Sequence, residues 1–86
     1  MDDLEGISVF IAVAEARNFR LAGERLGVTR SAVSQALQRL EDRIGVALVQ
    51  RTTRSVRLTE AGEHFLAAVR PSLAQVRDAV QSVREM

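Results

Sequence analysis

The side chains in this sequence that could recognise a ligand are hydrogen-bonding groups at helical spacing. Arginine, serine and glutamine follow one another in steps of one, three, one and three residues, and no acid interrupts the series. A guanidinium or amide can pair with two atoms of one base edge, and a hydroxyl can reach a base or a phosphate. The pattern predicts a helix face that contacts nucleic acid, formed by Arg30, Ser31, Ser34, Gln35 and Gln38.

Catalysis and metal binding find little support in the sequence. His64 is the only histidine, and there is no cysteine. No histidine and carboxylate cluster has metal-ligand spacing, no glycine-rich loop has a phosphate-binding pattern, and the serines lack a nearby base. We therefore expect no enzyme, no metal and no cofactor, and we interpret His64 as a surface residue.

Basic residues gather in the middle of the chain. All 12 are arginines, and nine of them lie between positions 17 and 57 against only three acids there. The rest of the chain has three arginines and eight acids. A basic centre between acidic ends is typical of a localised phosphate-binding surface. The preference for arginine over lysine has two explanations, phosphate contact and a GC-rich genome, which the composition leaves open.

Length and hydropathy limit the class of protein. A chain of 86 residues that is 47% hydrophobic is long enough for one small domain with an appended element and too apolar to be disordered. Its apolar runs are too short to cross a bilayer. We expect a cytoplasmic protein without a membrane partner.

Three helices are predicted to position the polar series. Apolar residues at three- and four-residue steps predict a helix over residues 3–17, followed by a short helix over 20–26 that ends at Gly27. Thr29 is the expected N-cap of a third helix that stops at Gly45. The third helix is expected to turn five apolar residues inward, namely Val33, Ala36, Leu37, Leu40 and Ile44.

Two of these helices form the pattern of a helix-turn-helix. Ala22 and Gly23 are small where the two helices would cross, and close approach is a reason to place glycine inside a helix. This geometry leaves the start of the third helix free to enter a major groove. The alternative is a solvated helix surface, and Arg39 and Arg43, with Glu41 or Asp42, fit that description.

A hairpin is predicted after Gly45. From Val46 to Leu58 the helical period is lost: Val46, Leu48 and Gln50 alternate with Ala47 and Val49, and β-branched residues become frequent. This pattern predicts two short strands around a polar, cationic tip. We expect Arg51, Thr53 and Arg54 to contact the DNA backbone or a minor groove. Arg57 belongs to the same arginine cluster, although strand alternation can turn it away.

A long last helix is expected from a Thr59 cap nearly to residue 86. Pro71 removes one backbone donor from it, with either a kink or a break as the result. Its apolar positions repeat in steps of four and three, which is typical of a dimerising helix, with packing on the chain's own domain as the alternative. The predicted dimer interface consists of Val69, Leu73, Val76, Val80 and Val83.

These residues also carry a family resemblance, which covers essentially the whole chain. The sequence resembles the N-terminal domain of LysR-type transcriptional regulators at Ala22, Leu26, Val28, Thr29, Ser31, Ala32, Val33, Ser34, Leu37, Leu40, Glu41, Ile44, Gly45, Leu48, Arg51, Leu58, Thr59, Ala61 and Gly62. The resemblance implies a mainly α winged helix-turn-helix, with three helices and a short two-stranded wing, followed by a long C-terminal linker helix that dimerises.

The resemblance also assigns roles to single residues. It places Arg30, Ser31, Ser34 and Gln35 at base edges or nearby phosphates, Thr29 and Arg51 near the backbone, and Arg54 on the wing. The sequence departs from the family where Arg20 and Leu21 stand in place of a serine or threonine that opens the second helix. Asn18 is then the remaining candidate cap. A second departure is Val49, where phenylalanine is frequent.

We therefore predict a DNA-binding domain over residues 1–58 and a dimerisation helix over residues 59–86. The expected partners are double-stranded DNA, as an interrupted inverted repeat, and a second copy of the chain. An effector ligand is expected only for the family's C-terminal domain, which is absent here, so we expect the chain to be part of a longer regulator. The alternative is a helical protein-interaction module that does not bind DNA.

Overall fold

The computed structural model describes residues 3–52 and 55–86, which form four helices and one antiparallel two-stranded sheet. The elements follow the predicted order and confirm the winged helix-turn-helix with a long last helix. Their bounds are α1 (Asp3–Ala16), α2 (Phe19–Leu26), α3 (Arg30–Ile44), β1 (Val49–Arg51), β2 (Val56–Leu58) and α4 (Glu60–Arg84).

Side-chain caps and glycines set the helix boundaries. The side chains of Asn18, Thr29 and Thr59 each accept a hydrogen bond from the backbone N–H three residues later, at 2.8, 3.0 and 3.0 Å. Gly27 and Gly45 end α2 and α3 in the left-handed conformation, with φ of 74° and 86°, which glycine adopts without steric cost. Asn18 thus caps α2 in place of the hydroxyl residue that the resemblance implied.

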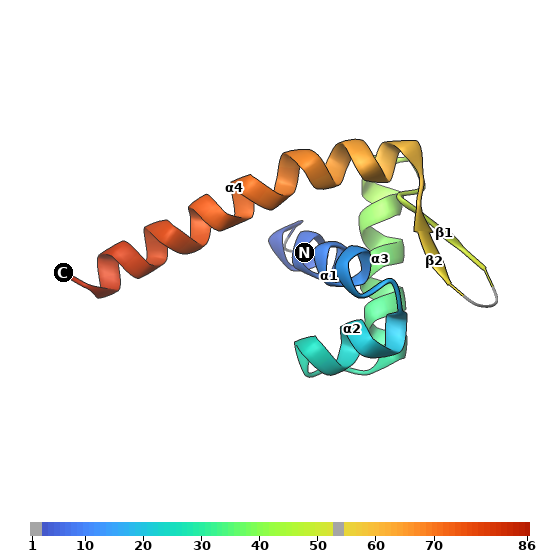
Figure 1. Cartoon of the computed structure of the whole chain (residues 1–86), viewed down its shortest axis with the longest axis horizontal. Coiled ribbons are helices and arrows are strands. Elements are labelled where there is room, and N and C mark those ends of the chain that lie inside the picture. The colour runs from blue at the N-terminus through green and yellow to red at the C-terminus, as the bar shows by residue number, and fades with distance from the viewer. Residues whose placement is uncertain (1–2, 53–54) are drawn as a thin grey trace.

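The core lies where α1 crosses α2 and α3, beneath the base of the wing (Figure 1). It is mainly aliphatic and includes Phe10 of α1 and Phe19 of α2. The Phe10 ring packs on the partly buried Phe65 of α4, with ring centroids 5.5 Å apart. The largest side chains with almost no exposure are Phe10, Val13, Val33, Leu37 and Leu48.

The last turn of α3 corrects one prediction. Ile44 was expected to point inward, but it is 43% exposed. Leu40, one turn earlier, already packs at Gly6, close to the start of α1. Ile44 therefore lies beyond the edge of the helix that would have covered it.

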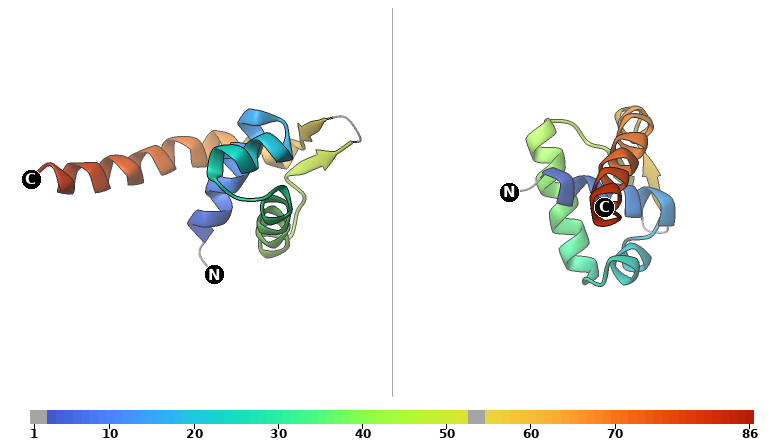
Figure 2. Two further views of the ribbon diagram at one scale, coloured as in Figure 1. Left: turned by 90° about the horizontal axis from the view of Figure 1, so that it is seen from below. Right: turned by 90° about the vertical axis from the view of Figure 1, so that its left-hand side faces the viewer.

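Helix α4 packs on α1 with its first half and projects away from the domain with its second half (Figures 1 and 2). Val69 and Leu73 are buried within the chain, at 9% and 8% exposure, and Arg70 forms an ion pair of 3.4 Å with Glu15 of α1. The helix continues through Pro71 without a break. Among the described residues, none of the helices has both the length and the apolar composition that a bilayer span requires.

Candidate nucleic-acid interface

The predicted reading face is assembled on the first half of α3. Thr29, Arg30, Ser31, Gln35 and Gln38 are exposed, and Ser34 is half-buried, on the side of the helix away from the buried Val33 and Leu37. Gln35 Nε2 donates to Ser31 Oγ at 3.4 Å, and Gln38 Nε2 donates to Asp42 Oδ1 at 3.0 Å. Each amide keeps its carbonyl oxygen and one N–H for a base edge.

The turn before α3 has the close approach expected at Gly23. A Cβ on this residue would lie 2.7 Å from the carbonyl oxygen of Val28, and the Val28 N–H donates to the Gly23 carbonyl at 2.9 Å. The absent side chain lets the turn pack directly against α2. The reading face is therefore set at a fixed angle to the rest of the domain.

The wing brings Arg51 back to the reading face. Strand β1 pairs with β2 so that Arg51 lies opposite Val56 and Gln50 lies opposite Arg57. Arg51 is thus on the side of the hairpin that packs on the domain, whereas Arg57 is exposed on the other side. Arg51 Nη1 donates to Ser34 Oγ at 3.1 Å, and the Arg51 guanidinium lies 4.9 Å from the centroid of the Phe19 ring. The predicted contact residues Thr53 and Arg54 lie outside the described residues.

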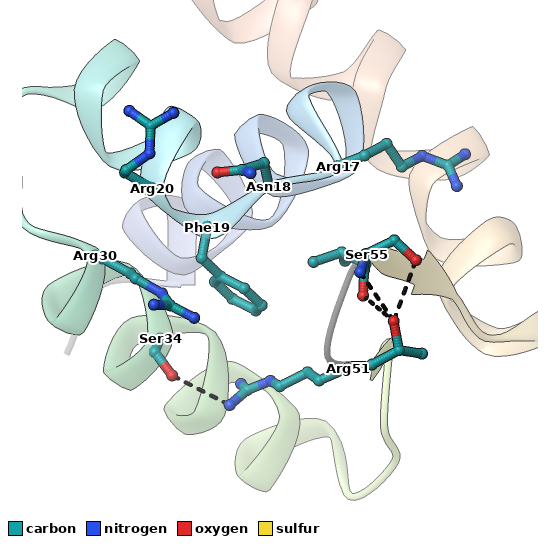
Figure 3. Close-up of a pocket in the computed structure, with 10 residues that line it drawn as sticks. Arg17, Asn18, Phe19, Arg20, Arg30, Ser34, Arg51 and Ser55 are labelled. Carbon is teal, nitrogen blue, oxygen red and sulfur yellow. Dashed lines mark hydrogen bonds between the residues drawn. The ribbon is translucent and has the colours of Figure 1, made fainter.

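A basic cavity of about 300 Å³ opens between α2, α3 and the wing. Four arginines and no acid line it: Arg17, Arg20, Arg30 and Arg51. In Figure 3, Arg30 and Arg51 point into the cavity beside Phe19, whereas Arg17 and Arg20 point outward from its rim. The arrangement offers positive charge at a scale that suits one phosphate group and its neighbours along a strand.

Arg17 and Arg20 are members of this cavity that the sequence did not assign to the site. Arg17 has φ of 56°, a left-handed conformation that is uncommon for a residue with a side chain, and its Nε donates to the Ala14 carbonyl at 3.1 Å. Arg20 forms an exposed ion pair with Glu24. Their only signal in the sequence was the excess of arginine in the central segment, which gives no position in space.

Glu41, like Ile44, differs from its prediction. It was expected on the solvated side of α3, but it is only 8% exposed. Its Oε2 accepts hydrogen bonds from the backbone N–H groups of Leu48 and Val49, at 2.7 and 3.2 Å. Thr59 holds the same segment from the other side, because its hydroxyl donates to the Ala47 carbonyl at 2.8 Å. These contacts fix the base of the wing against α3.

The predicted dimer stripe on α4 divides into two parts. Val69 and Leu73 are covered by the chain itself, whereas Val76, Val80 and Val83 are 43%, 49% and 68% exposed. His64 is exposed near the start of the same helix, and no group of three or more potential metal-ligating side chains occurs in the part of the chain that the structure describes.

Comparison with known proteins gives a consistent family. A family model described as "Bacterial regulatory helix-turn-helix protein, lysR family" matches residues 4–63. The HTH-type transcriptional regulator PgrR of Escherichia coli (strain K12) is 41% identical over 85 residues, which cover 99% of this chain and 28% of PgrR. BudR of Raoultella terrigena is 52% identical over 63 residues, which cover 73% of this chain and 22% of BudR. The chain therefore spans about a quarter of the length of these curated relatives.

Solved structures agree with this result at the level of the whole chain. The crystal structure of a CbnR_DBD–DNA complex superposes with a TM-score of 0.88 at 35% identity and covers 99% of this chain and 97% of that one. A BenM_DBD/benA site 1 DNA complex gives a TM-score of 0.90 at 28% identity over 99% of this chain and 94% of that one. Full-length CbnR, complexed with its target DNA, gives 0.86 at 36% identity, but this chain covers only 29% of it.

Proposed function

The chain belongs to the LysR family of bacterial regulatory helix-turn-helix proteins, as their DNA-binding domain, and from that premise we propose that it binds a specific double-stranded DNA site as a homodimer. The observation that carries the proposal is the basic cavity directly beside the polar face of α3. This one side of the molecule combines groups that can distinguish bases with groups that bind phosphate. The solved DNA complexes of CbnR and BenM support the same assignment.

The residue roles follow from position on the elements. We assign Arg30, Ser31, Ser34, Gln35 and Gln38 to the major groove and Thr29 to the adjacent backbone. Arg51 contributes phosphate contact from the wing, and we assign Thr53 and Arg54, which follow it in the sequence, to the minor groove or backbone. None of these roles requires a reacting group, so the proposed activity is binding and not catalysis.

Dimerisation is the second part of the proposal. We divide the chain into a DNA-binding unit, residues 1–58, and a linker helix, residues 59–86, and we assign the dimer interface to the exposed part of the predicted apolar stripe on this helix. Val76, Val80 and Val83 are exposed and available to a second copy, whereas Val69 and Leu73 support the helix on α1. A twofold pair presents two α3 helices to one duplex, so the expected site is an interrupted inverted repeat. An effector ligand would bind a further domain of a longer cytoplasmic regulator.

The first prediction tests DNA binding through salt. Neutralising phosphates releases counterions, so the logarithm of the affinity falls with the logarithm of the salt concentration, with a slope of about −0.9 per phosphate. For roughly six to ten contacts per dimer, affinity should fall by about 10³- to 10⁵-fold between 50 and 200 mM salt. The measurement is a mobility-shift titration on a site obtained by selection from random duplexes.

Two variants with equal charge change control this test. R51A removes the cavity arginine that we assign to phosphate contact and should make the slope shallower by about one for each half-site. R84A removes an arginine at the far end of α4 and should leave the slope as it is. If the affinity of the unmodified chain for duplex DNA does not change with salt concentration, DNA binding is contradicted and a protein-interaction module is favoured instead.

A further inference from the structure

The side chain of Arg51 contacts two elements besides its own strand. Its backbone belongs to the hairpin, opposite Val56. Its guanidinium stacks on the Phe19 ring at 4.9 Å and donates through Nη1 to Ser34 Oγ at 3.1 Å (Figure 3). The contact joins the wing to the middle of the reading face across 17 residues of sequence. Because α2 and α3 both contact it, the guanidinium is oriented toward the reading face in the absence of DNA.

This contact restricts what the Ser34 hydroxyl can do. A free serine hydroxyl is both a donor and an acceptor, and it rotates to suit its neighbour. Here a charged donor occupies one lone pair, and its positive charge opposes the approach of a second N–H group to the other. The hydroxyl proton remains available and is polarised toward donation. Ser34 is therefore preset as a donor.

We infer that Arg51 is a positioning residue that sets the base preference of Ser34. As a donor, Ser34 selects a base with an acceptor on its major-groove edge, such as guanine or adenine N7, guanine O6 or thymine O4. It disfavours cytosine, whose exposed edge presents the N4 amino donor. The inference rests on the proposed function, in that α3 must lie in the major groove. It adds a role in specificity to a residue whose charge alone would predict a sequence-independent phosphate contact.

The experiment measures base preference at every position of the selected site for the 86-residue chain and its variants. The unmodified chain should bind about tenfold more weakly when cytosine stands at the position that Ser34 faces. S34A should remove this penalty. R51M should remove the penalty at the same position, because methionine keeps an apolar stem over Phe19 but has no N–H to donate. The double variant S34A/R51M should show no further change in preference there, because both changes remove one linked interaction.

Two further variants separate positioning from charge. R51K restores a cationic donor and should retain the cytosine penalty. R57A removes the same charge from the exposed side of the hairpin and should leave the penalty unchanged. Circular dichroism confirms that each variant is folded before it is compared.

Different outcomes overturn different statements. If S34A loses the penalty and folded R51M retains it, Arg51 does not act through Ser34. If S34A leaves the base preference unchanged at every position of the site, Ser34 does not read a base. The inference then fails while the proposed function stands. If the unmodified chain binds no duplex in a salt-dependent manner, the proposed function itself fails.

Discussion

Single side chains join the wing to α3 through contacts between residues distant in sequence. Arg51 reaches Ser34, and Glu41 reaches the backbone of Leu48 and Val49. The chemical types of these residues were visible in the sequence, and the positions on α3 followed from helical spacing. Their partners were not predictable, because each contact depends on the path of a loop, and helical spacing carries no information about that path.

Glu41 accepts hydrogen bonds from two backbone N–H groups at the base of the wing. E41A leaves two buried N–H groups at the base of the wing without an acceptor, and each such loss costs roughly 1–3 kcal/mol. We expect the free energy of unfolding, measured by urea denaturation, to fall by about 3 kcal/mol. E41Q keeps a neutral acceptor, so its free energy of unfolding should fall by less than that of E41A. D42A, at the exposed neighbouring position, should change stability by no more than about 0.5 kcal/mol. Equal stability of E41A and D42A would show that Glu41 does not hold the wing.

Helices and strands were largely predictable because their ends carry local signals. Thr29 and Thr59 cap the helices they were expected to cap, and Gly27 and Gly45 end the two before the wing. Apolar periodicity was less informative about what covers each residue. Ile44 fits the inward pattern but is exposed, because α1 does not extend over it, whereas Leu73 of the predicted dimer stripe is buried within the chain. Periodicity defines a face of a helix, and tertiary packing decides how far along that face another element extends.

Helix α4 meets the base of the wing at Gly62. A Cβ on Gly62 would lie 2.0 Å from the carbonyl oxygen of Leu48, an impossible distance to a backbone atom. G62A must therefore displace the first turn of α4 from the wing, and we expect a loss of about 3 kcal/mol in the free energy of unfolding. G6A is the matched control, since its Cβ would meet Leu40 at an ordinary 3.4 Å and alanine favours a helix by up to about 1 kcal/mol. A thermal or urea melt in which G62A is as stable as G6A would contradict this account of the junction.

The basic surface and the projecting part of α4 lie in different parts of the molecule, whose longest dimension is 48 Å. The basic cavity and the reading face lie on the helix-turn-helix and wing, while the second half of α4 projects beyond the domain (Figure 2). The uneven distribution of charge predicted a localised basic surface, and the cavity confirms one. The projection of α4 shows which part of its apolar stripe can serve a second chain. That part begins after Leu73, and the choice of variant for a dimerisation test depends on it.

We expect V76D/V80D to yield a folded monomer. Both side chains are about half exposed on the projecting part of α4, so aspartates there leave the domain's own core intact but would bury charge against a partner's apolar surface, which costs several kcal/mol. Leu73 is unsuitable, because an aspartate there would disrupt the packing of α4 on α1 and unfold the domain with the dimer. The control A74D/Q81D adds the same two charges to exposed positions on the opposite side of the helix and should remain dimeric. Sedimentation equilibrium gives the oligomeric state, and a mobility shift should show operator binding weakened by about 100-fold or more for the monomer, because two half-site contacts are no longer coupled. If V76D/V80D sediments as a dimer and binds normally, the projecting half of α4 is not the interface, and the two recognition helices must be joined by another surface.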